Sequence, residues 1–157
     1  MKKQCTKLLS TVLMISLLIL GMPHFVNAED PGLYTFDVAA GTATITGYSG
    51  DLSGPITIPA TVFIDTTPYP VTAIAEYAFE FNENITSVVI ENGIQSIGDA
   101  AFYENTGITS ISFPDSVTNI GAFAFFGNTS LETLVLPNPA GGLTVGTAAF
   151  ALSLIQI

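Results

Sequence analysis

The strongest constraint on this sequence is an internal repeat with a period of 23 residues. Residues 85–107 and 108–130 align without a gap, and residues 131–153 continue the pattern with a longer middle. Each unit has apolar residues at its first, fourth and sixth positions, namely Ile85, Val88, Ile90, Ile108, Ile111, Phe113, Leu131, Leu134 and Leu136. A single unit of this kind cannot bury its apolar edge alone, so neighbouring units must stack. The repeat therefore predicts a solenoid.

Later positions of each unit also recur. An apolar-x-x-apolar-Gly step ends at Gly98 and at Gly121, and an Ala-Phe pair follows each step. Residues 56–84 form an earlier unit with the same two halves, separated by extra residues that include 66–70. Because that insertion is rich in Thr and Pro, we expect a protruding loop. In the last unit, residues 138–142 make the middle two residues longer.

The apolar spacing is that of leucine-rich repeats, whose period is about 20 to 29 residues. The Ile-x-Ile-Pro, Val-x-x-Ile-Gly and Ala-Phe motifs recur in register and resemble the BspA-type leucine-rich repeat family over residues 56–157. The resemblance implies a β-rich leucine-rich-repeat solenoid of about four coils of roughly 23 residues, with a short parallel sheet on one face. It also implies a secreted or cell-surface protein of the kind used in adhesion.

The expected organisation has three parts. Residues 1–28 are expected to be a signal peptide, residues 29–55 an N-terminal cap and residues 56–157 the repeats. Residues 36–55 are similar to the cap that often precedes repeats of this family. The expected units are residues 56–84, 85–107, 108–130 and 131–157.

Stacking gives each recurring position a role. The Phe residues should form an aromatic spine inside the solenoid, and the small Ala before each should let the turn approach the core. Three positions later, the Asn amides should satisfy backbone groups between coils. The Gly residues should supply backbone angles that other residues resist. The columns are Phe79, Phe102, Phe125 and Phe150; Asn82, Asn105 and Asn128, with Ser153 last; and Gly98, Gly121 and Gly146, with Ala75 first.

The strand positions that should face solvent form a candidate binding face. Extended solenoid faces are commonly used for binding, and a plain solvated sheet surface is the alternative that stays open. The candidate residues are Thr57, Ser87, Val89, Glu91, Ser110, Ser112, Thr133 and Val135. A second candidate contact site is the loop at residues 63–69, because exposed aromatic loop residues favour interfaces.

The N-terminus has the three parts of a secretory leader. Three lysines flank the start of an apolar run at residues 8–20, and a small-x-small cleavage site ends at Ala28. The run has about 13 residues, whereas a spanning helix needs roughly 20. We therefore expect a secreted or cell-surface protein with no stable membrane insertion after cleavage.

Cleavage would remove every Lys, the single His and the single Cys, and the sequence has no Arg. Residues 29–157 keep all 13 Asp and Glu, so their formal charge is −13. A surface of that sign repels nucleic acid and anionic lipid headgroups. The charge favours a cationic partner, or it serves solubility alone.

The missing residue types exclude most catalytic mechanisms. Without His, Cys or Lys there is no Ser-His-Asp triad, no thiolate and no Schiff base, and zinc loses its favoured ligands. The Asp-x-Asp runs of calcium loops do not occur. A spatial pair of carboxylates, as in glycosidases, stays open, and Glu80 and Glu83 are the closest pair in the expected folded region. We expect no catalytic site, metal or cofactor.

Two classes of function remain. The first is a module that binds a protein or a host or microbial surface ligand, and no nucleic acid. The second is a structural repeat segment, or a fragment of a longer surface protein, with no ligand of its own. The apolar residues 151–157 lack a polar cap, so we expect truncation or end-to-end self-association there. Asn84 and Asn128 match the N-glycosylation pattern.

The leader makes a direct prediction. Export should remove residues 1–28, because the cleavage site ends at Ala28, and the secreted chain should begin at Glu29. Intact-mass spectrometry of secreted material measures this. A secreted product that retains Lys2 to Lys7 would contradict the assignment.

Overall fold

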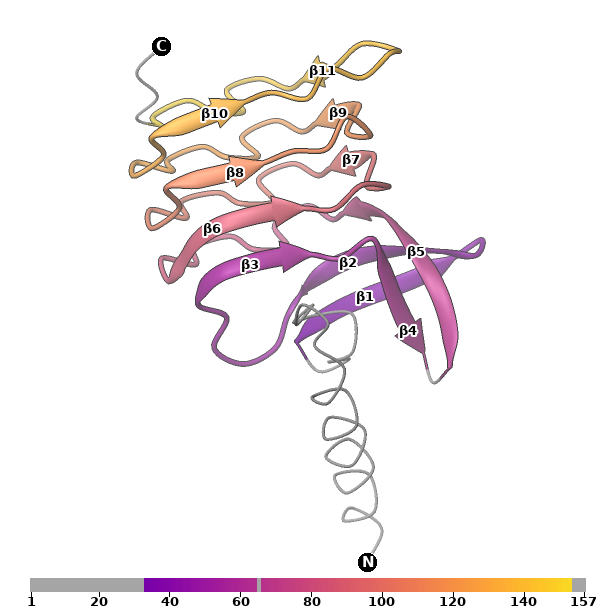
Figure 1. Cartoon of the computed structure of the whole chain (residues 1–157). Coiled ribbons are helices and arrows are strands. Elements are labelled where there is room, and N and C mark those ends of the chain that lie inside the picture. The colour runs from indigo at the N-terminus through magenta and orange to yellow at the C-terminus, as the bar shows by residue number, and fades with distance from the viewer. Residues whose placement is uncertain (1–32, 65, 154–157) are drawn as a thin grey trace, which may run out of the picture.

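The computed structural model describes residues 33–64 and 66–153. These residues contain strands and turns and no helix. Successive coils stack along one axis, from the cap-side strands to the last coil (Figure 1). The expected signal peptide and the tail at residues 154–157 lie outside the described residues.

One long side of the solenoid is a parallel sheet in the order β10-β8-β6-β3. Its strands are β3 (Gly54–Ile58), β6 (Ile85–Ile90), β8 (Ser110–Ser112) and β10 (Thr133–Val135). Figure 1 shows them one above another. Alternation along each strand sends one side chain inward and the next outward, as with buried Val88 and exposed Val89. The predicted leucine-rich-repeat solenoid with a parallel sheet on one face is confirmed.

A second sheet, which the sequence analysis did not anticipate, runs along another side of the coils (Figure 1). Its main order is β1 (Tyr34–Ala39), β2 (Thr42–Tyr48), β5 (Thr67–Ile74), β7 (Ser96–Ile97), β9 (Asn119–Ile120) and β11 (Thr144–Val145). β1 and β2 are antiparallel, and the later neighbours are parallel. Strands of two residues are too short to give a period-2 pattern. Val145 pairs with Ile120, which confirms that the last unit is two residues longer.

The hairpin of β1 and β2 is tied to the first coil by an aromatic residue. The Tyr34 hydroxyl donates a hydrogen bond to the carbonyl oxygen of Thr57 at 2.9 Å, and its ring meets the Phe79 ring edge-on at 6.0 Å. Burial raises the pKa of Tyr34, so its hydroxyl stays protonated as a donor. These contacts support residues 29–55 as a cap, which stays a proposal.

The expected loop at residues 66–70 is wrong. β4 (Thr61–Ile64) pairs with the first half of β5, so most of this segment is one arm of an antiparallel hairpin. The β-branched and aromatic residues of β4 favour that strand, and Val62 packs into the core. Pro68 and Pro70 are tolerated because β2 and β7 pair with β5 only from Val71 onward.

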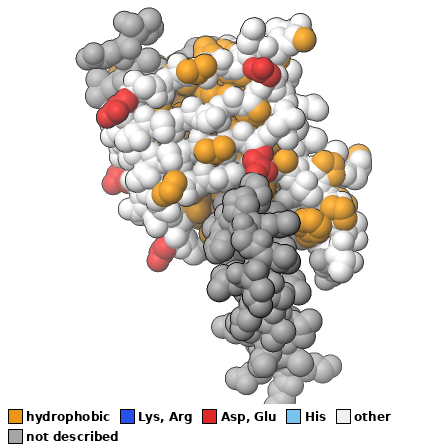
Figure 2. All heavy atoms as spheres, viewed as in Figure 1, with side chains coloured by type: hydrophobic (Ala, Val, Ile, Leu, Met, Phe, Trp, Pro, Cys, Tyr) orange, Lys and Arg blue, Asp and Glu red, His pale blue; other side chains and the backbone are white. Residues whose placement is uncertain are grey.

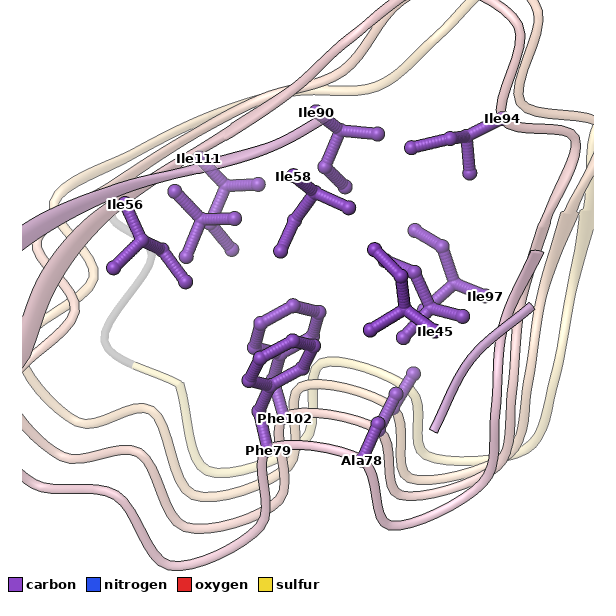
Figure 3. Close-up of a cluster of buried hydrophobic side chains, with 14 of the residues drawn as sticks. Ile45, Ile56, Ile58, Ala78, Phe79, Ile90, Ile94, Ile97, Phe102 and Ile111 are labelled. Atoms are coloured by element: carbon purple, nitrogen blue, oxygen red, sulfur yellow. The ribbon is translucent and has the colours of Figure 1, made fainter. Parts of the chain in front are cut away.

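The aromatic spine is confirmed. The rings of Phe79, Phe102, Phe125 and Phe150 stack in sequence, with centroids 4.9, 5.1 and 5.2 Å apart and planes within 8° of parallel. Figure 3 shows two of these rings rising from the turns toward the isoleucines of the four-stranded sheet, with Ala78 beside them. Ring separation matches the spacing of about 4.8 Å between neighbouring strands. One ring per coil therefore fills the core without a gap.

The expected reason for the glycine column is wrong. Gly98, Gly121 and Gly146 do not have positive φ angles. A Cβ atom on Gly121 would instead lie 2.6 Å from the backbone nitrogen of Asp99 in the preceding coil, and the other two glycines are equally crowded. Glycine is needed there because two backbones approach closely. The backbone N–H of each glycine donates a hydrogen bond to the preceding coil, as Gly98 does to the carbonyl oxygen of Ile74. Ala75, the first residue of the column, makes the equivalent bond to the carbonyl oxygen of Ile45 at 2.8 Å.

Replacing one ring of the spine tests the core. Phe102→Ala should lower the free energy of unfolding by roughly 3–5 kcal/mol, because Phe102 is fully buried between two stacked rings. Denaturant unfolding followed by circular dichroism measures the change. Ser112→Ala, on the exposed sheet face, is the control and should cost less than about 0.5 kcal/mol. Equal losses in the two variants would refute the assignment of inside and outside.

Candidate functional site

The register of the four-stranded sheet brings the candidate face together as two rows. The first row crosses four strands at Thr57, Val89, Ser112 and Val135. The second row contains Ser87, Ser110 and Thr133, and it begins at Pro55 on β3. Parallel pairing at one period places these side chains directly above one another. Seven of the eight predicted residues therefore share one continuous surface.

The face is flat and made of short side chains. Val135 is 78% exposed and Val89 44% exposed, whereas Ser87 and Ser110 are half-buried between their neighbours. Figure 2 shows scattered apolar side chains separated by polar atoms and backbone. Such a surface offers small hydroxyl and aliphatic groups. It suits contact with another extended surface better than enclosure of a small ligand.

Glu91, the eighth predicted residue, has a different position. It follows β6 at the corner of the coil, and its carboxylate accepts a hydrogen bond from the backbone N–H of Ala60 at 2.7 Å. The backbone N–H of Glu91 donates in turn to the carbonyl oxygen of Ile58 at 3.1 Å. Glu91 thus connects two coils, and its carboxylate is engaged within the protein.

The asparagine ladder is confirmed. Each side-chain amide donates to a carbonyl oxygen of the preceding coil: Asn82 to Leu52, Asn105 to Phe79 and Asn128 to Phe102, at 2.8 to 3.0 Å. In the last coil the hydroxyl of Ser153 donates to the carbonyl oxygen of Phe125 at 2.8 Å. Asn128 is fully buried, so of the two glycosylation motifs only exposed Asn84 presents its side chain to solvent.

The second candidate contact site, residues 63–69, belongs to the hairpin of β4 and β5. Phe63 and Ile64 at the end of β4 are 40% and 42% exposed, and Tyr69 on β5 is half-buried. Figure 1 shows this hairpin extending away from the stacked coils. Of the two aromatic residues expected to be accessible, Phe63 is exposed, whereas Tyr69 packs partly against the core, and both lie on paired strands.

Sequence reasoning missed a hollow of about 260 Å³ beside the first coil. Tyr48, Asp51, Phe81 and Glu83 contribute to its lining, together with the loop that joins β2 to β3. These residues are far apart in the sequence, and no short motif links them. Within residues 33–64 and 66–153, no group of three or more His, Cys, Asp or Glu side chains could hold a metal ion.

The repeated coils, the parallel strand pairing between coils and the buried Phe and Asn columns define a leucine-rich repeat protein. The family model described as "BspA type Leucine rich repeat region (6 copies)" matches residues 65–156. Because this match covers more than half of the sequence, the chain belongs to the BspA-type leucine-rich repeat family. No curated protein matches the chain. In the described part of the chain, no helix is long and apolar enough to cross a bilayer.

Solved structures of bacterial leucine-rich repeat proteins are similar to this chain. One from Bacteroides capillosus has 31% identity and a TM-score of 0.69, covering 80% of this chain and 96% of its own. A leucine rich cell surface protein from Faecalibacterium prausnitzii has 32% identity and a TM-score of 0.66, covering 76% and 32%. One from Bacteroides ovatus has 27% identity and a TM-score of 0.71, covering 78% and 32%. The chain spans about a third of the last two proteins.

The engaged carboxylate of Glu91 can be tested by substitution. Glu91→Ala should lower the free energy of unfolding by roughly 1–2 kcal/mol, because it leaves the N–H of Ala60 without its charged acceptor. The control is Glu132→Ala, which removes an exposed carboxylate in the unit that starts at residue 131. It should change the free energy of unfolding by less than about 0.5 kcal/mol. Thermal unfolding of both variants measures the difference. A Glu91→Ala variant as stable as the control would show that the bond contributes nothing.

Proposed function

We propose that this protein is a non-catalytic, secreted or cell-surface module that binds other proteins through its four-stranded sheet. The observation that carries the proposal is the alignment of seven predicted residues in two rows across that sheet. Sheet faces of solenoids are extended, so they present many small contacts to one partner. Adhesion to a host or microbial surface is the use that fits this geometry and the sequence leader.

Surface location has two independent supports. The N-terminal sequence has the three parts of a secretory leader. A structurally similar protein from Faecalibacterium prausnitzii is described as a leucine rich cell surface protein, and it is 32% identical to this chain. The absence of Lys and His after residue 28 supports a non-catalytic role, since nucleophile activation by these groups is then excluded.

The alternative is a structural repeat segment with no ligand of its own. The half-buried serines of the second row favour it, because they offer little side-chain area to a partner. Exposed Val89 and Val135 favour binding, since a partner that covers them would remove their apolar surface from water. β10 and β11 are the outer strands of their sheets among the described residues, and end-to-end association through them stays a proposal.

A charge placed on the sheet face tests the binding proposal. Ser112→Lys puts an unpaired cation between Val89 and Val135, so a partner captured from bacterial or host surface extracts should bind at least tenfold more weakly. The control is Thr144→Lys, an exposed position on β11 of the other sheet. Surface plasmon resonance with the captured partner measures both affinities. If both variants bind the partner as tightly as the parent protein binds it, the partner does not use this face.

A further inference from the structure

The turns that carry the Phe spine also carry aromatic side chains on their outer surface. These four turns, at residues 75–84, 98–107, 121–130 and 146–153, form what we call the turn face. Its aromatic strip consists of Tyr77, Phe81, Tyr103, Phe123 and Phe126. Three of these side chains are large and exposed, with Phe81 at 64%, Tyr77 at 54% and Phe123 at 42%.

Four of the strip's rings form one connected row outside the core. Phe81 meets Tyr103 edge-on at 5.5 Å, Tyr103 stacks on Phe126 at 5.2 Å, and Phe126 meets Phe123 edge-on at 5.8 Å. The row runs from the first coil to the third. The turns that carry Phe79 and Phe102 lie across the core from the isoleucines of the four-stranded sheet (Figure 3). A connected exposed apolar area of this kind indicates a contact surface.

The fold requires the backbone of these turns but not their aromatic residues. Tyr77, Phe81 and Phe123 each have φ near 57°, the left-handed region that bulky residues avoid. The backbone bonds to the next coil impose that angle, as with the N–H of Phe81, which donates to the carbonyl oxygen of Tyr103 at 2.8 Å. The column of Tyr77 also holds Ala100, Phe123 and Ala148, and the column of Phe81 also holds Glu104, Gly127 and Leu152.

Alanine, glycine and glutamate also fit these columns, so the turn does not need an aromatic residue, and an aromatic residue there combines a strained backbone with exposed apolar area. Neither cost is compensated within the core, because these side chains point away from it. Strained residues cluster at contact and functional sites, where another interaction offsets the strain. The aromatic choices in these columns thus indicate a partner.

Charge limits what that partner can be. The described residues include ten Asp and Glu and no Lys, Arg or His. Half of those acidic residues lie on the turn face, namely Glu76, Glu80, Glu83, Asp99 and Glu104. Nucleic acid, anionic lipid and a second copy of this acidic chain are all disfavoured by repulsion. Carboxylates beside exposed aromatic rings are the groups that bind ammonium and guanidinium ions.

We propose that the turn face docks a Lys- and Arg-rich segment of a partner protein, whose cations contact the aromatic strip and its flanking carboxylates. The hollow at the first coil, where Asp51 and Glu83 lie with Tyr48 and Phe81, receives one cationic side chain at the end of the strip. This surface is separate from the sheet face, so the two binding proposals succeed or fail independently.

Titration of the purified protein with short oligolysine and oligoarginine peptides tests the inference. Binding is followed by anisotropy of a labelled peptide at physiological ionic strength. The double variant Phe81→Gly, Phe123→Ala should bind about tenfold more weakly, because two exposed aromatic contacts with cations are lost. The double variant keeps every charge of the parent. It introduces residue types that already occur in the same columns, glycine as at Gly127 and alanine as at Ala148. Phe81→Gly relieves the left-handed strain at that position, whereas Phe123→Ala keeps a Cβ atom at positive φ, and each change removes one exposed ring contact. The melting temperature should therefore stay close to that of the parent.

Phe63→Ala is the matched control, because Phe63 is an aromatic residue of similar exposure, 40%, that lies on β4 outside the strip. It should bind both peptides like the parent. Equal peptide affinity in parent and double variant would mean attraction by net charge alone and would overturn the proposal. Two other results would also overturn the proposal: the parent self-associates in light scattering and the double variant does not, or the parent binds neutral oligosaccharides and the double variant does not. Either result would assign the strip to another occupant.

Discussion

The backbone hydrogen bonds between successive coils are the constraint on which the rest of this structure depends. In the sheets they form parallel ladders, and in the turns alternate N–H groups, such as those of Tyr77, Phe79 and Phe81, donate to the next coil. These bonds fix one coil-to-coil spacing for every column of side chains. Phe rings stack at that spacing, asparagine amides reach the preceding coil, and glycine occupies the closest backbone approach.

The buried columns could be predicted from the sequence because each repeats one residue type at one period. Phe102 and Asn105 recur in neighbouring units at the same separation, and burial leaves no other position for a large ring or a paired amide. The second sheet could not be predicted, because strands such as β7 and β9 have only two residues. The hairpin of β4 and β5 was also missed, since Thr and Pro are typical of loops unless tertiary pairing overrides that preference.

The candidate sites show the same limit. Strand alternation correctly placed Val89 and Ser112 outward, because a side chain's direction follows from its position in the strand. It could not predict that the Glu91 carboxylate binds the N–H of Ala60, since that contact joins residues 31 positions apart. The aromatic strip was missed for another reason. Its members occupy several different columns, and only the geometry of the turns brings Phe81, Tyr103 and Phe126 into one row.

The division between core and surface columns explains where specificity can reside in such a protein. Once backbone bonds and the Phe spine determine the coil, an outward column can hold Tyr77, Ala100, Phe123 or Ala148 without altering the fold. The carboxylates of the described residues have no cationic side chain among those residues to pair with. Coil stacking therefore relies on apolar contact and on hydrogen bonds of backbone, asparagine and carboxylate groups rather than on ion pairs, whereas the charges of the outer surface have no cationic side chain beside them. Ionic contacts on that surface must come from a partner, and salt weakens them without weakening the solenoid.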